Sequence, residues 1–138
     1  MCNKEQFSHD CEDEKLIIYR DELVFVILNR YPYNPGHLLI SPYRHVGDLT
    51  QLKDEEMLDM MKVTTKMQQL LQKVMNPDGF NIGVNTGKAG GAGLEDHLHI
   101  HIVPRWNGDN NFMPVIGGSR IVPEALEATA QLLRDAVI

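Results

Sequence analysis

The sequence predicts an α+β domain with an antiparallel sheet of about five strands, one long crossover helix and a C-terminal helix. Three observations carry this prediction. Short apolar runs occur in sequence-adjacent pairs, one amphipathic stretch is long enough to cross the sheet, and a second helical pattern closes the chain. Adjacent pairs joined by a single crossover favour antiparallel pairing. With 138 residues, the chain can bury a hydrophobic core, and residues 1–138 are expected to form a single domain.

The predicted strands are short apolar runs rich in β-branched residues and bounded by turn signals. A charged turn separates the first two strands, and Asn34-Pro35-Gly36 is a turn before the third. A fourth strand precedes a glycine-rich loop, and a histidine-containing strand follows that loop. The five expected strands are Leu16–Tyr19, Leu23–Leu28, His37–Ile40, Asn81–Val84 and residues 97–103.

Residues 54–75 are predicted to form the long helix, because apolar side chains recur there at helical spacing. Three acidic residues complement the dipole at its N-terminus, and Asn76-Pro77-Asp78-Gly79 ends it. A second helix is expected to begin at Pro123, a favoured first position, and to run through Leu132–Leu133. The stripe expected to pack in the core consists of Met57, Met60, Met61, Met67, Leu70, Leu71 and Val74.

Composition excludes several classes of partner. The chain has 13 basic and 19 acidic residues and no basic run, so long nucleic acid is not an expected partner. No apolar stretch approaches the ~20 residues of a membrane span, and the N-terminus lacks the apolar core of a signal peptide. Cys2 and Cys11 do not form a disulfide framework. A cytoplasmic location is therefore expected.

Three histidines alternate with apolar residues in His97-Leu98-His99-Ile100-His101. Successive side chains of a strand point to opposite faces, so His97, His99 and His101 are expected to share one face. The apolar residues between them suit the core. A row of imidazoles on a half-buried strand is costly unless it serves chemistry.

Three interpretations of this row are open. The first is a solvated strand face that happens to carry histidines. The second is a metal site, although the outer two histidines of a straight row lie ~6.6–7 Å apart, which is awkward for one tetrahedral ion. The third is nucleophilic catalysis on phosphorus, in which one ring nitrogen attacks while the other is held by an acceptor. The third interpretation is favoured because it also uses the loop that precedes the row.

The loop over residues 85–93 contains a Gly-Lys pair that invites comparison with a phosphate-binding P-loop. The comparison fails, because Gly83 is one residue too close and Ala89 replaces the Ser or Thr that would bind magnesium. A plain flexible connector and a cradle of backbone amides for phosphate both remain open.

The run 97–103 resembles the His-x-His-x-His-x-x signature of the histidine triad (HIT) superfamily of nucleotide hydrolases and transferases. The resemblance extends over nearly the whole chain. Residues 25–30 with Pro35-Gly36-His37 are similar to the family's nucleotide-binding segment, and Pro42-Tyr43-Arg44-His45 resembles the stretch that follows it. Residues 104–112 resemble the branch of diadenosine tetraphosphate phosphorylases and fragile-histidine-triad-type hydrolases.

The resemblance implies roles for individual residues. His99 would attack the α-phosphorus and form a nucleotidyl-histidine intermediate, with its other nitrogen held by a backbone carbonyl. His97 and His101 would contact phosphoryl oxygens or the leaving group, and His37 would complete the cluster. The implied nucleotide-binding residues are Asn29 for the ribose, Phe25, Ile27 and Leu28 for the base, and Asn85, Gly91, Ala92 and Gly93 near the phosphates.

Two departures from the family pattern are visible. Many relatives carry an N-terminal Cys-x-x-Cys zinc clip, whereas Cys2 and Cys11 are nine residues apart. Structural zinc is therefore not expected, although these cysteines with His45 and His97 keep it conceivable. Several relatives also place a Ser or Thr shortly before the triad, and residues 87–96 contain neither. The group that protonates the leaving group is thus unassigned.

The sequence consequently predicts a nucleotidyl hydrolase or transferase that cleaves dinucleoside polyphosphates, such as diadenosine tetraphosphate, with phosphate or water as acceptor. A nucleoside phosphoramidase with the same chemistry and a non-catalytic nucleotide- or metal-binding module are the alternatives. No cofactor is expected, apart from a divalent cation that could arrive with the polyphosphate. The resemblance also implies a homodimer with a sheet extended across the interface.

Overall fold

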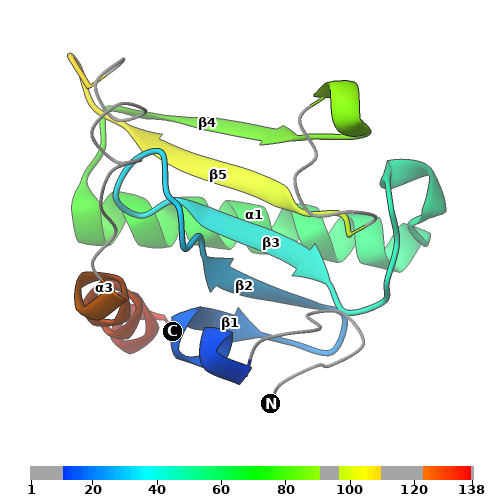
Figure 1. Ribbon diagram of the computed structural model, residues 1–138, viewed down its shortest axis with the longest axis horizontal. Coiled ribbons are helices and arrows are strands. Elements are labelled where there is room, and N and C mark those ends of the chain that lie inside the picture. The colour runs from blue at the N-terminus through cyan, green and yellow to red at the C-terminus, as the bar shows by residue number, and fades with distance from the viewer. Residues whose placement is uncertain (1–10, 91–96, 110–122, 138) are drawn as a thin grey trace.

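A five-stranded antiparallel sheet organises the described part of the chain, which in this computed structural model comprises residues 11–90, 97–109 and 123–137. The predicted α+β class is confirmed. The strand order is β1-β2-β3-β5-β4, so that β5 is inserted between two strands that precede it in sequence (Figure 1). The strands are β1 (Ile17–Arg20), β2 (Val24–Leu28), β3 (Leu38–Pro42), β4 (Gly79–Val84) and β5 (Ile100–Arg105).

The long helix α1 (Asp54–Met75) lies behind the sheet in Figure 1 and covers one of its faces. It ends at Asn76, whose left-handed backbone (φ 50°) stops the helix as the sequence predicted. The core stripe was predicted only in part, because Met57 and Met61 are 44% and 57% exposed. The buried face repeats at intervals of three and four residues, through Glu56, Met60, Val63, Thr64, Met67, Leu70 and Leu71.

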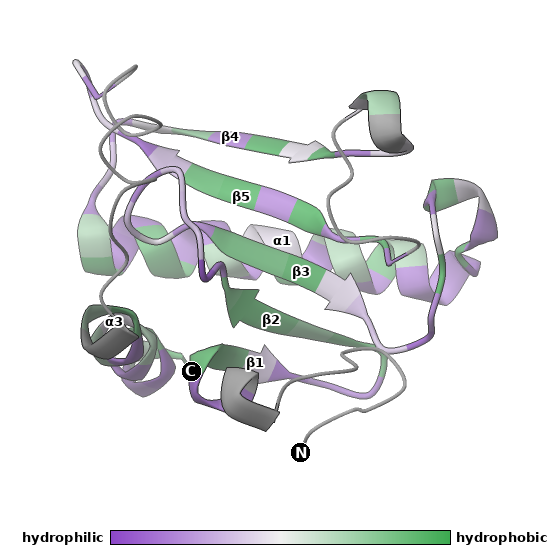
Figure 2. Ribbon diagram, in the orientation of Figure 1, coloured by the Kyte–Doolittle hydropathy of each residue, from purple (hydrophilic) through white to green (hydrophobic). Residues whose placement is uncertain are grey.

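Strand β2 is buried along its whole length and is uniformly apolar in Figure 2. It pairs with β1 on one side and β3 on the other. The β1–β2 turn is closed by the Asp21 carboxylate, whose Oδ1 accepts from the backbone N–H groups of Leu23 and Val24 at 2.8 Å each. Observed strand ends differ from the predicted ones by one or two residues, except in the histidine run described below.

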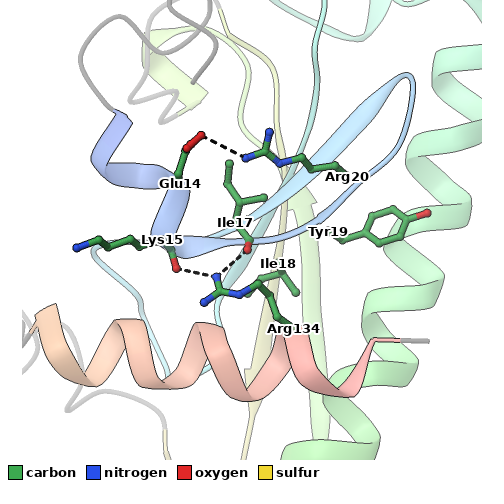
Figure 3. A pocket seen from close by; sticks show the side chains of 7 residues that line it. All are labelled: Glu14, Lys15, Ile17, Ile18, Tyr19, Arg20 and Arg134. Atoms are coloured by element: carbon green, nitrogen blue, oxygen red, sulfur yellow. Dashed lines mark hydrogen bonds and ion pairs between the residues drawn. The ribbon is translucent and has the colours of Figure 1, made fainter. Parts of the chain in front are cut away.

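The C-terminal helix α3 (Pro123–Ala136) begins at the predicted proline and packs beside β1 (Figure 1). Two of its own residues, Ala130 and Leu133, are fully buried. Arg134 ties the helix to the start of the sheet, because its Nη1 donates to the Lys15 carbonyl (2.8 Å) and the Ile17 carbonyl (3.0 Å), as Figure 3 shows. The short helices are η1 (Cys11–Leu16), η2 (Leu49–Gln51) and η3 (Lys88–Gly90).

Within the described ranges, no helix is both long and apolar enough to cross a membrane.

Candidate functional site

The pairing of β3 with β5 brings the histidines together. Leu39 lies opposite His101, and directly paired residues of an antiparallel sheet point to the same face. Alternation along β3 then places His37, Leu39 and Ser41 on the face that carries His101. The residues between them, such as Leu38 and Ile40, are fully buried in the core. The histidine face is therefore the one opposite α1.

The histidine row is not one continuous strand, and the predicted range of 97–103 was wrong at both ends. Strand β5 begins at Ile100, so His97 and His99 precede it. The N–H of Leu98 donates to the Val46 carbonyl at 2.8 Å instead of joining the ladder with β3. The alternation still holds, because Leu98 is 1% exposed and points into the core while His99 is partly exposed.

His99 has one ring nitrogen occupied and one available. Its Nδ1 lies 3.1 Å from the backbone carbonyl oxygen of His97. A carbonyl can only accept, so Nδ1 carries the hydrogen, and Nε2 of the neutral ring keeps a lone pair. Burial lowers the pKa of His99, and the bond to the His97 carbonyl opposes this effect only in part. A neutral imidazole with an available nitrogen is a nucleophile at neutral pH.

A chain of hydrogen bonds determines which ring nitrogens of His37 and His101 carry hydrogen. The backbone N–H of Tyr33 donates to Nδ1 of His37 at 3.1 Å, so the neutral His37 ring carries its hydrogen on Nε2. That Nε2 donates to Nδ1 of His101 at 2.9 Å. The neutral His101 ring must then carry its own hydrogen on Nε2. Nδ2 of Asn85 lies 3.4 Å from this Nε2, at an exposed position. Two donors do not bond, so Asn85 accepts the Nε2 hydrogen only with its amide turned to present Oδ1.

The ring of His97 has different neighbours. Ser41 Oγ donates to the Leu98 carbonyl at 2.9 Å, so it accepts from Nε2 of His97, 2.5 Å away. Nδ1 of His97 faces Nδ1 of His45 at 3.4 Å. With 4% exposure, His97 is buried behind the site. A contact from this ring to a phosphoryl oxygen stays a prediction, and the backbone carbonyl of His97 is the group that accepts from Nδ1 of His99.

Burial keeps the cluster neutral. It lowers the pKa of His37 to about 3, and the nearby His101 and His99 act in the same direction. Burial likewise lowers the pKa of His97 to about 4, with His45 and His99 contributing, and that of His101 to about 4, with His99 contributing. Desolvation disfavours the charged form of an imidazole. All three rings are therefore neutral at pH 7.

Only some of the residues predicted to bind the nucleotide lie beside the histidine cluster. Asn29 reaches the cluster, with its amide nitrogen 3.4 and 3.5 Å from the two ring nitrogens of His37, while its Oδ1 accepts from the Tyr31 N–H at 2.9 Å. Phe25, Ile27 and Leu28 are only 1–6% exposed and form part of the core. Their contact with a base stays a prediction. Gly91, Ala92 and Gly93 lie outside the described residues.

Sequence analysis did not identify Ser41, and it named His45 only as a conceivable zinc ligand. Ser41 sits two positions beyond Leu39 on the histidine face, so strand alternation from His37 could have identified it. His45 follows β3 in a loop, and only the three-dimensional fold shows that it meets His97. Tyr33 was also missed, because its contribution comes from a backbone N–H that no side-chain pattern reveals.

His45 and His97 also bear on the question of a metal. Two nitrogens bound to one tetrahedral zinc at ~2.0–2.1 Å lie about 3.3 Å apart, and the observed separation of 3.4 Å fits. In the part of the chain that the structure describes, however, no group of three or more His, Cys, Asp or Glu side chains is placed to hold a metal ion.

Comparison with known proteins agrees with this geometry. The HIT domain family model matches residues 10–108, and the chain therefore belongs to the histidine triad (HIT) family. The AP-4-A phosphorylase of Mycobacterium tuberculosis is 47% identical over 122 residues, which cover 88% of this chain and 63% of that protein. This chain therefore spans less than two thirds of the length of that relative.

Two further relatives place the chain within the family. The asymmetrical bis(5'-nucleosyl)-tetraphosphatase of Schizosaccharomyces pombe is 36% identical over 93 residues, covering 67% of this chain and 50% of that protein. The crystal structure of a zinc-bound histidine triad family protein from Mycobacterium smegmatis superposes with a TM-score of 0.73 at 35% identity, covering 88% of this chain and 83% of the other.

Proposed function

We propose that this chain is a nucleotidyl hydrolase or transferase that cleaves dinucleoside polyphosphates at the α-phosphorus through a covalent nucleotidyl-His99 intermediate. The observation that carries the proposal is the hydrogen bond from Nδ1 of His99 to the His97 carbonyl, which leaves Nε2 available for attack. The names of the mycobacterial and fission yeast relatives support the substrate class.

The proposed reaction has two displacements. In the first, the Nε2 lone pair of His99 forms a bond to the α-phosphorus, and the bond from that phosphorus to the bridging oxygen breaks, its electron pair leaving with the departing nucleotide. In the second, an oxygen of phosphate or water attacks the same phosphorus and the P–N bond breaks, which restores neutral His99. Both steps depend mainly on positioning and charge stabilisation. The phosphorylase name of the mycobacterial relative favours phosphate as the acceptor.

We propose that His101 donates a hydrogen bond to the departing oxygen. Its Nε2–H follows from the bonding chain that starts at the Tyr33 amide. A neutral imidazole can donate a hydrogen bond to a phosphate oxygen, but it is a poor source of the full proton that an amine needs in order to leave. With its pKa lowered to about 4, the neutral His101 ring is suited to donating a hydrogen bond to the departing phosphate oxygen.

The proposal is tested by incubating the protein with diadenosine tetraphosphate, with and without inorganic phosphate, and identifying the products. Release of ADP that requires phosphate identifies a phosphorylase, and release of AMP and ATP in water identifies a hydrolase. Rapid quenching in base, followed by intact mass measurement, should show one added adenylate on His99. Nucleotide binding without any turnover would instead identify a binding module.

His99→Ala provides the matched test of the nucleophile. Loss of a covalent nucleophile should lower kcat by about 10⁴-fold or more, and adenylation should disappear while binding of diadenosine tetraphosphate persists. Lys66→Ala serves as a control away from the cluster, because Nζ of Lys66 lies over the ring of Tyr19 on β1, 4.5 Å from its centroid. Full activity in the His99 variant would contradict the proposal.

We further infer that two copies associate through strand β4. It is an edge strand, and Asn81, Ile82 and Gly83 on it are exposed, with Ile82 at 46%. An exposed edge offers unpaired backbone groups to another strand. Ile82→Lys should lower the mass measured by light scattering from that of a dimer to that of a monomer, whereas a wild-type monomer would refute the association.

A further inference from the structure

The turn before β3 is packed against the strand that carries His101. Asn34 opens this four-residue turn, in which the His37 N–H donates to the Asn34 carbonyl at 3.2 Å. Gly36 has φ +82°, the value that a type II turn requires at its third residue. An added Cβ at Gly36 would lie 3.2 Å from Cγ of Pro104 on β5. The backbone of the turn therefore has little room to shift relative to β5.

The side chain of Asn34 makes a second connection to the same strand. It is 5% exposed, and its Nδ2 donates to the Pro104 carbonyl at 2.8 Å and to Oδ2 of Asp109 at 2.7 Å. A side-chain amide has two N–H hydrogens, so both of them are used. Moving the turn away from β5 would break these bonds and leave buried polar groups without partners, which is costly.

Asp109 is itself held in place, so it can serve as an anchor for Asn34. Its Oδ1 accepts from Nη2 of Arg105 at 2.8 Å, and its Oδ2 accepts from Nε of Arg105 at 3.0 Å. The backbone N–H of Trp106 also donates to Oδ2, at 2.8 Å. The bonds from Arg105, followed by the bond from Trp106, hold the pKa of Asp109 well below its usual range. Asp109 is therefore a charged acceptor at neutral pH, and charged acceptors form the stronger hydrogen bonds.

Asn34 is next in sequence to the residue whose amide determines where the histidines carry hydrogen. The Tyr33 N–H donates to Nδ1 of His37 at 3.1 Å, and Nε2 of His37 donates to Nδ1 of His101 at 2.9 Å. If the Tyr33 peptide tilted away, either nitrogen of the His37 ring could carry the hydrogen. The hydrogen of His101 would then no longer be confined to Nε2.

We propose that Asn34 is a positioning residue for the reaction. Its bonds to Pro104 and Asp109 hold the Tyr33 amide on His37, and this arrangement keeps the hydrogen of His101 on Nε2. The inference rests on the proposed function, in which that Nε2–H bonds to the departing oxygen. Asn34 attaches the loop that bears one ring of the pair to the strand that bears the other, so the two rings keep their relative position.

The test replaces Asn34 and measures both rate and ring hydrogens. Asn34→Ala should lower kcat for diadenosine tetraphosphate by up to about 10²-fold, the scale for a small misplacement of a catalytic group, while KM changes little. Nitrogen NMR with isotope-labelled histidine distinguishes ring nitrogens that carry hydrogen from those that do not. In the variant, the hydrogen of His101 should be distributed over both nitrogens. Nδ1 of His99 should keep its hydrogen, because the His97 carbonyl still accepts it.

Two further variants accompany this test. Thr64→Ala is the matched control, because it removes a buried bond from the Thr64 hydroxyl to the Met60 carbonyl (2.7 Å) on α1 without touching the loop. It should leave kcat and the ring hydrogen of His101 unchanged. Asp109→Asn retains the shape of the side chain but offers one acceptor oxygen in place of two. It should redistribute the hydrogen of His101 in the same direction, and it replaces Asn34→Ala in the comparison if that variant does not fold.

Two results would overturn the proposal. An unchanged hydrogen distribution on His101 would show that Asn34 does not control this ring. A redistributed hydrogen with an unchanged kcat would show that the control has no consequence for the reaction. Failure of the proposed function is recognised separately, because a wild-type protein that does not cleave diadenosine tetraphosphate contradicts that function, while the NMR comparison still shows whether Asn34 determines the hydrogen position.

Discussion

The histidine cluster consists of two pairs, His37 with His101 and His45 with His97, on either side of His99. In the first pair, Nε2 of His37 meets Nδ1 of His101 at 2.9 Å, and the outer Nε2 of His101 reaches an exposed position beside Asn85. In the second, the two Nδ1 atoms face each other at 3.4 Å, and the outer nitrogen of His97 is closed off by Ser41. Imidazoles from one sequence motif therefore have different surroundings, and the proposed function gives them different tasks: His101 would face the substrate, and His97 would support His99.

Apart from the loss of His99 itself, the largest expected effect distinguishes the two outer members of the triad, His97 and His101. His101→Ala should lower kcat for diadenosine tetraphosphate by about 10²–10³-fold, the range for losing one hydrogen-bond donor to developing negative charge. His97→Gln should lower it less, because the backbone carbonyl that holds His99 is retained. Steady-state rates are the measurement, with circular dichroism to confirm that each variant folds. A larger loss in His97→Gln would reverse the assignment of tasks.

Much of this cluster could be predicted from the sequence, because two-residue alternation is a local property of the backbone. Alternation at 97–101 predicted that His99 and His101 would be neighbours, and the turn before His37 predicted a strand that could lie beside them. Whether each ring nitrogen carries hydrogen depends on partners such as the Tyr33 amide and Ser41 Oγ, which come from distant segments or from the backbone. The separation of the row into two pairs therefore required the three-dimensional structure.

The errors on α1 have a similar cause. Helical spacing predicted that methionines would be buried, but the spacing alone does not fix which side of the helix faces the sheet. The buried stripe includes Glu56, which the Arg44 guanidinium holds through contacts of 3.1 and 2.7 Å, whereas Met57 is turned outward. A charged residue inside the stripe becomes understandable only when its partner from the loop after β3 is visible.

The next effect in size concerns the supporting pair. Ser41→Ala should lower the free energy of unfolding by about 1–3 kcal/mol, because Nε2 of His97 and the Leu98 carbonyl would both lose a buried hydrogen-bond partner. Urea unfolding is the measurement. Thr65→Ala is the matched control, since its hydroxyl donates to the Met61 carbonyl at an exposed position and its loss should cost far less. Equal costs would mean that the buried bonds at Ser41 contribute no more than an exposed one.

A smaller effect is expected in the pH profile of kcat/KM. Nε2 of His99 must be unprotonated to attack, and burial lowers the pKa of this ring below its usual 6.5. Activity should therefore persist as pH falls through 6.5 and decline only at lower pH. Hydrolysis or phosphorolysis rates between pH 4 and 8, at substrate concentrations well below KM, check this. A decline centred at or above 6.5 would show that the nucleophile is not shielded by the protein.

The smallest expected effect concerns how the free energy of unfolding depends on pH. Asp59 and the buried histidines change this free energy in opposite directions as pH falls. The Asp59 carboxyl on α1 lies against that of Asp21, and burial followed by the interaction with Asp21 raises its pKa to about 6. Oδ2 of Asp59 is buried without a hydrogen-bond partner among the described residues. Two carboxylates can bond only if one is protonated, which agrees with the raised pKa.

The signs of the two contributions to stability are opposite. The pKa of His37, His97 and His101 is lowered to about 3–4 in the folded protein. As pH falls from 6.5, these histidines therefore bind protons in the unfolded chain but not in the folded one, and the free energy of unfolding decreases. The pKa of Asp59 is raised, so stability increases as pH falls through about 6. Each histidine in this window contributes up to about 1.4 kcal/mol per pH unit. Asp59→Asn should therefore steepen the loss of stability between pH 6 and 4 in urea titrations, and an unchanged slope would show that Asp59 holds no extra proton in the folded protein.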